Sequence, residues 1–230
     1  MITLKLSNIY SQLSSNKSKI NKYINVLKIY DPTDPKFQED FAYFFALNPT
    51  DWIKNTSKIV GTDTWMDDIT RKEAFFQIFD KYMKMPKGTV TYSNIIQDLS
   101  SVPMRKGNGS VQVSFSSKIL HVIDVDKPII DQKMMLKLAH PSSNFKSSVG
   151  LKVTGKKKLV AHIGNGLNND QKIKDAIGFY SEVELYYNEL KTEPATKTYL
   201  EDFDNWCNSQ GINPSLISET KKIDFWMWLA

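Results

Sequence analysis

The stretch SFSSKILHVIDVDKPIIDQKMMLKLAH, residues 114–140, decides the fold that the sequence predicts. Its first half carries apolar side chains at helical spacing from Phe115 to Ile123. Pro128 should end this helix, because a proline disfavours the helical conformation in the residue before it. Asp131 then precedes a second apolar run, where it would accept backbone N–H bonds as an N-cap. Three hydroxyl side chains are placed to cap the first helix: Ser114, Ser116 and Ser117.

Lys118 and Asp131 therefore stand at the adjoining ends of two apolar helices, thirteen residues apart in the sequence. One interpretation is structural: Lys118 keeps its ammonium in water at the surface, and Asp131 is an ordinary N-cap. The other interpretation is functional: the Lys118 amine and the Asp131 carboxylate act together at one site. A family resemblance favours the functional interpretation.

Apolar residues at helical spacing predict helices along most of the chain, so the predicted fold class is mainly α. Residues 89–101 fit either a helix or a strand that leads into a helix. Between Lys146 and Ile163, β-branched residues surround the turn-like TGKKK, which is compatible with a small β-hairpin. The predicted helices cover residues 8–29, 37–47, 66–84, 168–191, 198–211 and 221–230.

The chain has 230 residues, of which 41% are hydrophobic, and this is enough to bury a core. We expect a single domain over residues 1–230, and a division into an N-terminal helical part, 1–90, and a catalytic core, 91–230, stays open. The N-terminus is too polar for a signal peptide, and no apolar run approaches the roughly 18 residues that a membrane span requires. We therefore expect a cytoplasmic monomer that does not enter a membrane.

Basic residues concentrate in the middle of the chain. Residues 101–158 hold eleven Lys or Arg and three Asp, a net charge of +8, whereas the whole chain carries +5. The remainder is therefore slightly acidic. Such a segment is typical of a protein that neutralises DNA phosphates, and it is as typical of a lysine-rich solvated surface.

Metal and disulfide chemistry are not indicated by the sequence. Cys207 is the single cysteine, which excludes an internal disulfide framework. The three histidines, His121, His140 and His162, have no ligand-like spacing. We expect no metal and no cofactor.

Residues 104–139, MRKGNGSVQVSFSSKILHVIDVDKPIIDQKMMLKLA, resemble the helix-hairpin-helix DNA glycosylases, specifically their 8-oxoguanine DNA glycosylase-like branch. In that superfamily a glycine-bearing hairpin leads into a helix with an early lysine, a Pro-containing loop follows, and an aspartate caps the next helix. Gly107 and Gly109 stand in the place of the hairpin, Lys118 in that of the lysine, and Asp131 in that of the aspartate. The family's Leu-Pro-Gly-Val-Gly type of hairpin is absent, and the interval between lysine and aspartate is shorter here.

The resemblance implies a helical glycosylase fold and an enzyme that flips a base out of double-stranded DNA and cleaves its N-glycosidic bond. Asp131 would stabilise the positive charge that builds up on the sugar. Lys118 would form a Schiff base with the sugar and permit β-elimination, or would only hold a phosphate. The residues that would contact the DNA backbone are Arg105, Lys106, Gly107, Gly109, Ser116, Ser117 and Lys133.

Aromatic side chains would line the base pocket in this interpretation. They are Phe115 from the opening stretch and Phe225, Trp226 and Trp228 from the DFWMWLA segment. The same residues are as typical of ordinary core packing. The base stays open between an oxidised purine and another modified base, including a bulky phage modification, so excision would serve either repair or defence.

Two other functions stay open. PIIDQK also fits the acid-x-lysine half of a PD-(D/E)xK nuclease, with Asp124 or Asp126 as the upstream acid, Lys133 as the lysine and magnesium as the cofactor. That function needs Ile129 and Ile130 on a β-strand. The third function is a non-catalytic DNA-binding module, in which Lys118 and Asp131 are only structural.

Overall fold

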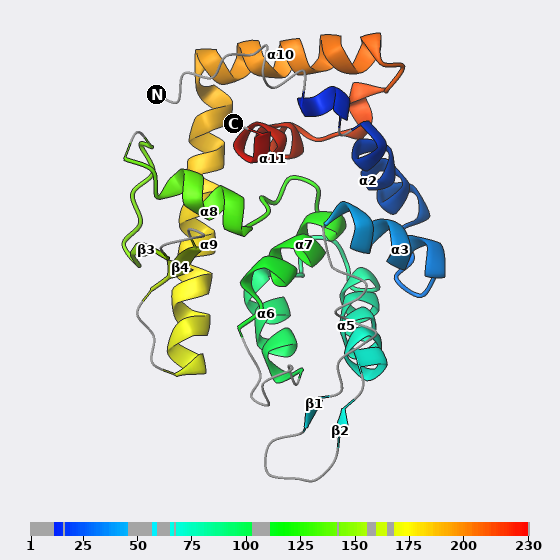
Figure 1. Cartoon of the computed structure of the whole chain (residues 1–230), viewed down its shortest axis with the longest axis vertical. Helices are drawn as coiled ribbons and strands as arrows, with labels where there is room; N and C mark the ends of the chain where they lie inside the picture. The colour runs from blue at the N-terminus through cyan, green and yellow to red at the C-terminus, as the bar shows by residue number, and fades with distance from the viewer. Residues whose placement is uncertain are drawn as a thin grey trace. The chain divides into compact units, whose positions relative to one another are not determined.

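The computed structural model of the chain describes residues 12–15, 17–45, 57–58, 65–66, 68–102, 111–141, 143–155, 160–164 and 168–229. These residues are mainly helical, which confirms the predicted fold class, and two short antiparallel hairpins accompany the helices (Figure 1). The chain divides into two compact units. Residues 18–124 form the first unit, and residues 125–230 with residues 1–17 form the second. The predicted single-domain organisation stays a prediction.

The first unit consists of helices around α5, α6 and α7, which pack against one another (Figure 1). Within residues 89–101, Tyr92–Ser101 form a helix and no strand precedes it, and the hydroxyl of Thr91 caps the helix by accepting a hydrogen bond from the backbone N–H of Asn94 at 3.2 Å. The elements are α2 (Lys17–Ile29), α3 (Pro35–Phe44), β1 (Ser57–Lys58), β2 (Trp65–Met66), α5 (Asp68–Met83), α6 (Tyr92–Ser101) and α7 (Val113–Ile123).

The start of α7 differs from the prediction. The helix begins at Val113, with Gln112 in the N-cap position and no side-chain hydrogen bond there, so the three serines lie inside the helix and do not cap it. Two of their hydroxyls donate to backbone carbonyls three or four residues earlier instead: Ser116 Oγ donates to Gln112 O at 2.7 Å, and Ser117 Oγ donates to Ser114 O at 2.9 Å. Short hydroxyl side chains often bond to carbonyls three or four residues earlier when they lie inside a helix.

Aromatic rings form the core of the first unit. The ring of Phe41 lies at its centre, with centroid distances between 4.6 and 6.1 Å to five other phenylalanine rings. Tilted and edge-to-face arrangements predominate, as expected for rings whose faces repel one another. The five partners come from α3, from the residue that follows it and from α5: Phe37, Phe45, Phe75, Phe76 and Phe79.

The second unit packs α11 against α8, α9 and α10, with a hairpin beside α8 and α9. The predicted hairpin is confirmed: β3 and β4 pair antiparallel, with Leu151 opposite Ile163 and Thr154 opposite Val160. The elements are α8 (Gln132–Leu138), β3 (Leu151–Thr154), β4 (Val160–Ile163), α9 (Asn169–Thr192), α10 (Pro194–Ser209), the 3-10 turn η1 (Pro214–Leu216) and α11 (Glu219–Leu229).

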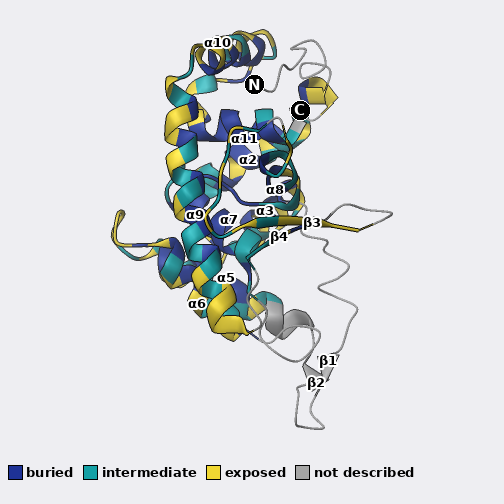
Figure 2. Cartoon of the chain, turned by 90° about the vertical axis from the view of Figure 1, so that its left-hand side faces the viewer, coloured by how far each residue is buried: buried dark blue, intermediate teal, exposed yellow. Residues whose placement is uncertain are grey.

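The predicted helix at residues 168–191 is α9, which is the longest helix of the second unit. Asn168 caps its start by accepting from the N–H of Gln171 at 2.8 Å, and the chain leaves the helix at Glu193, before Pro194 starts α10. The buried residues recur at intervals of three or four, as in Phe179, Val183 and Tyr187. Figure 2 shows that α9 and α10 each have buried and exposed sides.

None of the helices in the described part of the chain combines the length and the apolar character that are needed to cross a membrane. The cytoplasmic location and the monomeric state stay predictions.

Candidate functional site

Lys118 and Asp131 belong to different units. Lys118 lies in α7 of the first unit, and Asp131 precedes α8 in the second. The predicted encounter of the two side chains therefore stays a prediction. Four of the predicted DNA contacts, Arg105, Lys106, Gly107 and Gly109, lie outside the described residues.

Lys118 is buried, with 8% of its surface exposed, so it is not the surface lysine of the structural interpretation. Its Nζ donates a hydrogen bond to the backbone carbonyl of Phe45 at 3.2 Å. The same Nζ lies 5.8 Å from the ring centroid of Phe45 and 5.4 Å from that of Phe115, which are cation–π distances. A carbonyl and two aromatic faces therefore surround the ammonium.

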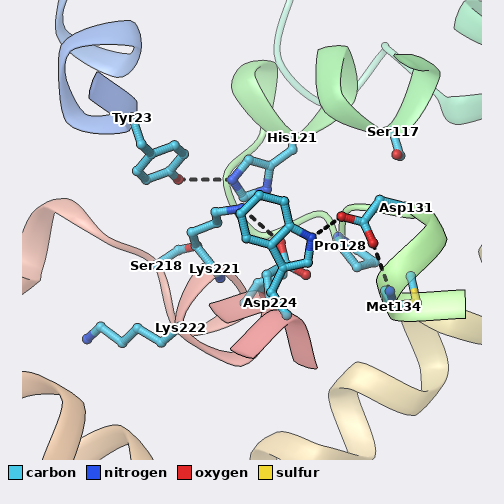
Figure 3. Close-up of polar contacts among 12 residues, drawn as sticks. Tyr23, Ser117, His121, Pro128, Asp131, Met134, Ser218, Lys221, Lys222 and Asp224 are labelled. Atoms are coloured by element: carbon cyan, nitrogen blue, oxygen red, sulfur yellow. Dashed lines mark hydrogen bonds and ion pairs between the residues drawn. The ribbon is translucent and has the colours of Figure 1, made fainter. Parts of the chain in front are cut away.

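Asp131 caps α8, as the sequence predicts, and both of its carboxylate oxygens are engaged. Oδ1 accepts a hydrogen bond from the backbone N–H of Met134 at 2.8 Å (Figure 3). Oδ2 accepts from the indole N–H of Trp228 in α11. The side chain is nevertheless half-buried, so part of it reaches solvent. Two donors on separate oxygens thus fix the orientation of the Asp131 carboxylate.

The segment before Asp131 is held along its length by α11 and by Ser218, which precedes that helix. Ser218 Oγ donates to the carbonyl of Val125 at 2.6 Å and Thr220 Oγ1 to that of Asp126 at 3.1 Å. Further along, the N–H of Ile129 bonds to the carboxylate of Asp224, and Trp228 reaches Asp131. Thr220, Asp224 and Trp228 follow one another at intervals of four and therefore share one face of α11. We call residues 125–131 the clasped segment.

Asp224 is the most connected member of this face. Its Oδ1 accepts a hydrogen bond from the hydroxyl of Tyr187 at 2.7 Å, and its Oδ2 accepts from Lys221 Nζ at 3.4 Å (Figure 3). Burial raises the pKa of Asp224 to about 6, although Lys221, the Tyr187 hydroxyl and the Ile129 N–H each favour its ionised form. Burial also lowers the pKa of Lys221, against the opposing effects of Asp224 and Asp131.

Further basic groups of the second unit lie near Asp131 or at the surface of the unit. Lys133 is exposed, and its Nζ lies 5.1 Å from the ring centroid of Trp228, the residue that bonds to Asp131. Lys127 forms a 2.8 Å ion pair with Glu184, which neutralises one charge of the basic segment. Lys146 and Lys152 are exposed. The predicted contacts Ser116 and Ser117 are buried in the first unit.

The aromatic residues predicted for a base pocket pack in different places. Phe225 is buried and its ring stacks on Phe203 of α10 with a centroid distance of 5.8 Å. The ring of Trp226 lies 5.7 Å from that of Tyr199, also in α10. Phe115 packs edge-on against Phe75 in the first unit, at 5.5 Å. These contacts are typical of core residues, and the role of these three residues and of Trp228 in base binding stays a prediction.

The nuclease function has no support from the clasped segment. Ile129 and Ile130 lie in irregular chain before α8 and do not belong to a β-strand. Among the residues that the structure describes, no three His, Cys, Asp or Glu side chains gather in a group that could hold a metal ion.

Sequence reasoning missed Thr220, Lys221, Asp224 and Tyr187. A signal was present in TKKIDFWMW, since Thr220, Asp224 and Trp228 recur at intervals of four. A threonine and an aspartate on the face of a helix that is rich in aromatic residues indicate a buried polar contact, because buried polar groups require partners.

The chain was compared with protein-family models, with curated proteins and with solved structures, and none of them matches it.

Proposed function

We propose that the protein is a DNA glycosylase, in which Asp131 stabilises the positive charge that develops on the sugar when the N-glycosidic bond of a flipped base breaks. The support is the state of the Asp131 carboxylate. It is half-buried, and separate donors on its two oxygens, the Met134 N–H and the Trp228 indole, fix its direction. The resemblance of residues 104–139 to the helix-hairpin-helix glycosylases supplies the substrate class.

A fixed carboxylate suits this reaction for a physical reason. Breaking the bond between sugar and base leaves the sugar with the character of an oxocarbenium ion. A negative group that already points in the right direction need not reorganise when this charge appears. The exposed Lys133, Lys146 and Lys152 of the second unit are available to neutralise phosphates on a bound duplex.

Lys118 is the amine that the resemblance assigns to a lyase step. Lys118 is buried, and a lysine amine in its neutral form could attack a sugar carbon as the nucleophile of such a step. In the proposal Lys118 forms the Schiff base or, failing that, holds a phosphate. Repair and defence against phage DNA with modified bases are both compatible with this chemistry.

The test is base release in EDTA from duplexes that carry oxidised, deaminated, alkylated or phage-type modified bases. Wild type is compared with Asp131→Asn and with Asp34→Asn. Asp34 is a matched control because it also caps a helix, accepting from the N–H groups of Lys36 and Phe37, but it belongs to α3. Asparagine is as good an N-cap as aspartate, so both variants should fold. The proposal expects base release to fall at least about a hundredfold in Asp131→Asn alone.

Borohydride trapping in the same reactions tests the lyase step. An adduct that forms with wild type and is lost in Lys118→Ala identifies Lys118 as the Schiff-base amine. Base release that is equal in Asp131→Asn and wild type contradicts the proposal. Strand cutting that requires magnesium indicates the nuclease, and DNA binding without any base release indicates a binding module.

A further inference from the structure

The carboxylate of Asp224 joins three parts of the second unit. It receives the Tyr187 hydroxyl from α9, the Lys221 ammonium from α11 and the Ile129 N–H from the clasped segment. Ile129 is two residues before Asp131, so the position of its backbone limits where Asp131 begins α8. The side chain of Asp224 is 7% exposed, so water cannot readily replace these partners.

We propose that Asp224 is a positioning residue, which fixes Asp131 by holding the clasped segment against α11 in its ionised form. The inference rests on the proposed function for its catalytic meaning, and its structural content can be measured separately. Asp224 would touch no DNA and would act only through the backbone of Ile129 and the orientation of Asp131.

The ionised form matters because of thermodynamic linkage. The Lys221 ion pair, the Tyr187 hydroxyl and the Ile129 N–H each lower the pKa of Asp224, so each is stronger when Asp224 is charged. Protonation therefore weakens all three contacts together. The charged and titratable groups that face Asp224 are Lys221 in α11, Tyr187 in α9 and Asp131 at the start of α8.

The same helix provides a matched control. Lys222 Nζ lies 2.6 Å from Asp204 Oδ1 in α10, so Lys222 and Asp204 form a second lysine–aspartate pair. In Figure 3 the ammonium of Lys222 points away from Lys221 and Asp224. The Asp204 pair joins α10 to α11 and has no member in the clasped segment. Asp204→Asn thus removes one carboxylate that pairs with a lysine of α11, although a more exposed one than Asp224, without changing the support of Ile129.

The first measurement is hydrogen exchange of peptides that cover residues 125–134, in wild type, Asp224→Asn, Tyr187→Phe and Asp204→Asn. Exchange reports local opening of the backbone and needs no substrate. We expect exchange at Ile129 and the first turn of α8 to become about tenfold faster in Asp224→Asn, less so in Tyr187→Phe, and to stay at the wild-type rate in Asp204→Asn. Equal exchange in wild type and Asp224→Asn overturns the inference.

Tyr187→Phe provides a second arm, which keeps the inference testable if Asp224→Asn fails to fold. It removes one hydrogen bond to the Asp224 carboxylate and leaves the carboxylate in place, so exchange in residues 125–134 should be faster than in wild type and in Asp204→Asn. Exchange at the wild-type rate in Tyr187→Phe contradicts the positioning role.

Base release completes the test on a responsive substrate. We expect kcat in Asp224→Asn to fall about tenfold with KM nearly unchanged, because the variant misplaces a group that acts in the transition state. The wild-type rate should fall below about pH 6, and this limb should be absent from Asp224→Asn and kept in Asp204→Asn. If wild type releases no base, the glycosylase proposal fails, while faster exchange in Asp224→Asn still supports the positioning role.

Discussion

The indole N–H of Trp228 donates a hydrogen bond to the carboxylate of Asp131, although 97 residues separate the two in the sequence. This contact joins the far end of α11 to the start of α8. Because the other oxygen of Asp131 is bound by the Met134 N–H, rotation of the carboxylate breaks at least one hydrogen bond. The direction in which Asp131 points therefore depends on a residue from the last helix of the second unit.

Trp228→Phe should reduce base release while leaving the fold intact. Phenylalanine keeps an aromatic ring beside Lys133 but cannot donate to Asp131. Hydrogen bonds to charged groups contribute about 1.5–3 kcal/mol, and partial exposure of Asp131 favours the lower end, so we expect about a tenfold loss in kcat/KM. Trp226→Phe is the control, since Trp226 packs against Tyr199 in α10. Equal losses in both variants would mean that the aromatic volume matters and the hydrogen bond does not.

Asp224 should make the unfolding free energy depend on pH in an unusual direction for an aspartate. Its pKa in the folded chain is raised from 3.8 to about 6, so the folded state binds the proton more tightly than the unfolded state does. The associated stability is fully present below pH 3.8 and is lost as the pH rises through about 6. A shift of this size corresponds to about 3 kcal/mol.

Urea unfolding of wild type and Asp224→Asn at several pH values between 4 and 7 measures this dependence. The difference between the two unfolding free energies should shift in favour of wild type as the pH falls across this range. A constant difference would show that Asp224 titrates near its ordinary value.

Phe41→Ala should be among the most destabilising substitutions in the first unit. Phe41 is fully buried and contacts five other phenylalanine rings, so alanine leaves a cavity that these rings cannot fill by a small movement. The expected cost is about 3–5 kcal/mol in the free energy of unfolding, measured with urea. Tyr43→Ala, in the same helix but 49% exposed, should cost less than about 1 kcal/mol. A small effect of Phe41→Ala would indicate that the aromatic cluster repacks.

Cys207 should be inert towards thiol reagents in the folded protein. Its side chain is buried, and burial, helped by Asp204, raises the pKa of its thiol to about 12. The thiolate is the reactive species, and almost none of it exists at pH 8. Titration with a chromogenic disulfide should detect less than about a tenth of a thiol per folded chain and one per chain in denaturant. Rapid reaction of the folded protein would contradict this burial.

The sequence predicts features that depend on local rules, and they are present in the structure. Asp131 caps α8 because a short acceptor before an apolar run satisfies the first N–H groups wherever it occurs. The β3–β4 hairpin follows from β-branched residues on both sides of a turn-like segment. The start of α7 was mispredicted, since its N-cap residue, Gln112, gives no capping signal.

Features that depend on distant partners could not be predicted. Lys118 is buried, and its ammonium donates a hydrogen bond to the carbonyl of Phe45, 73 residues earlier, a partner that nothing near Lys118 in the sequence indicates. The hydrogen bonds that Ser218 and α11 make to the clasped segment join residues 93 to 97 positions apart. Spacing by four in α11 shows that Thr220, Asp224 and Trp228 share a face, but it does not show what that face contacts.

The contacts between α11 and residues 125–131 can form only late in the synthesis of the chain. The backbone around Asp131 leaves the ribosome more than ninety residues before Trp228, and until then its carbonyls and its carboxylate lack their donors from α11. A nascent chain therefore carries Asp131 without its orientation. In the proposed glycosylase, the active carboxylate would therefore lack its orientation until translation has passed through α11.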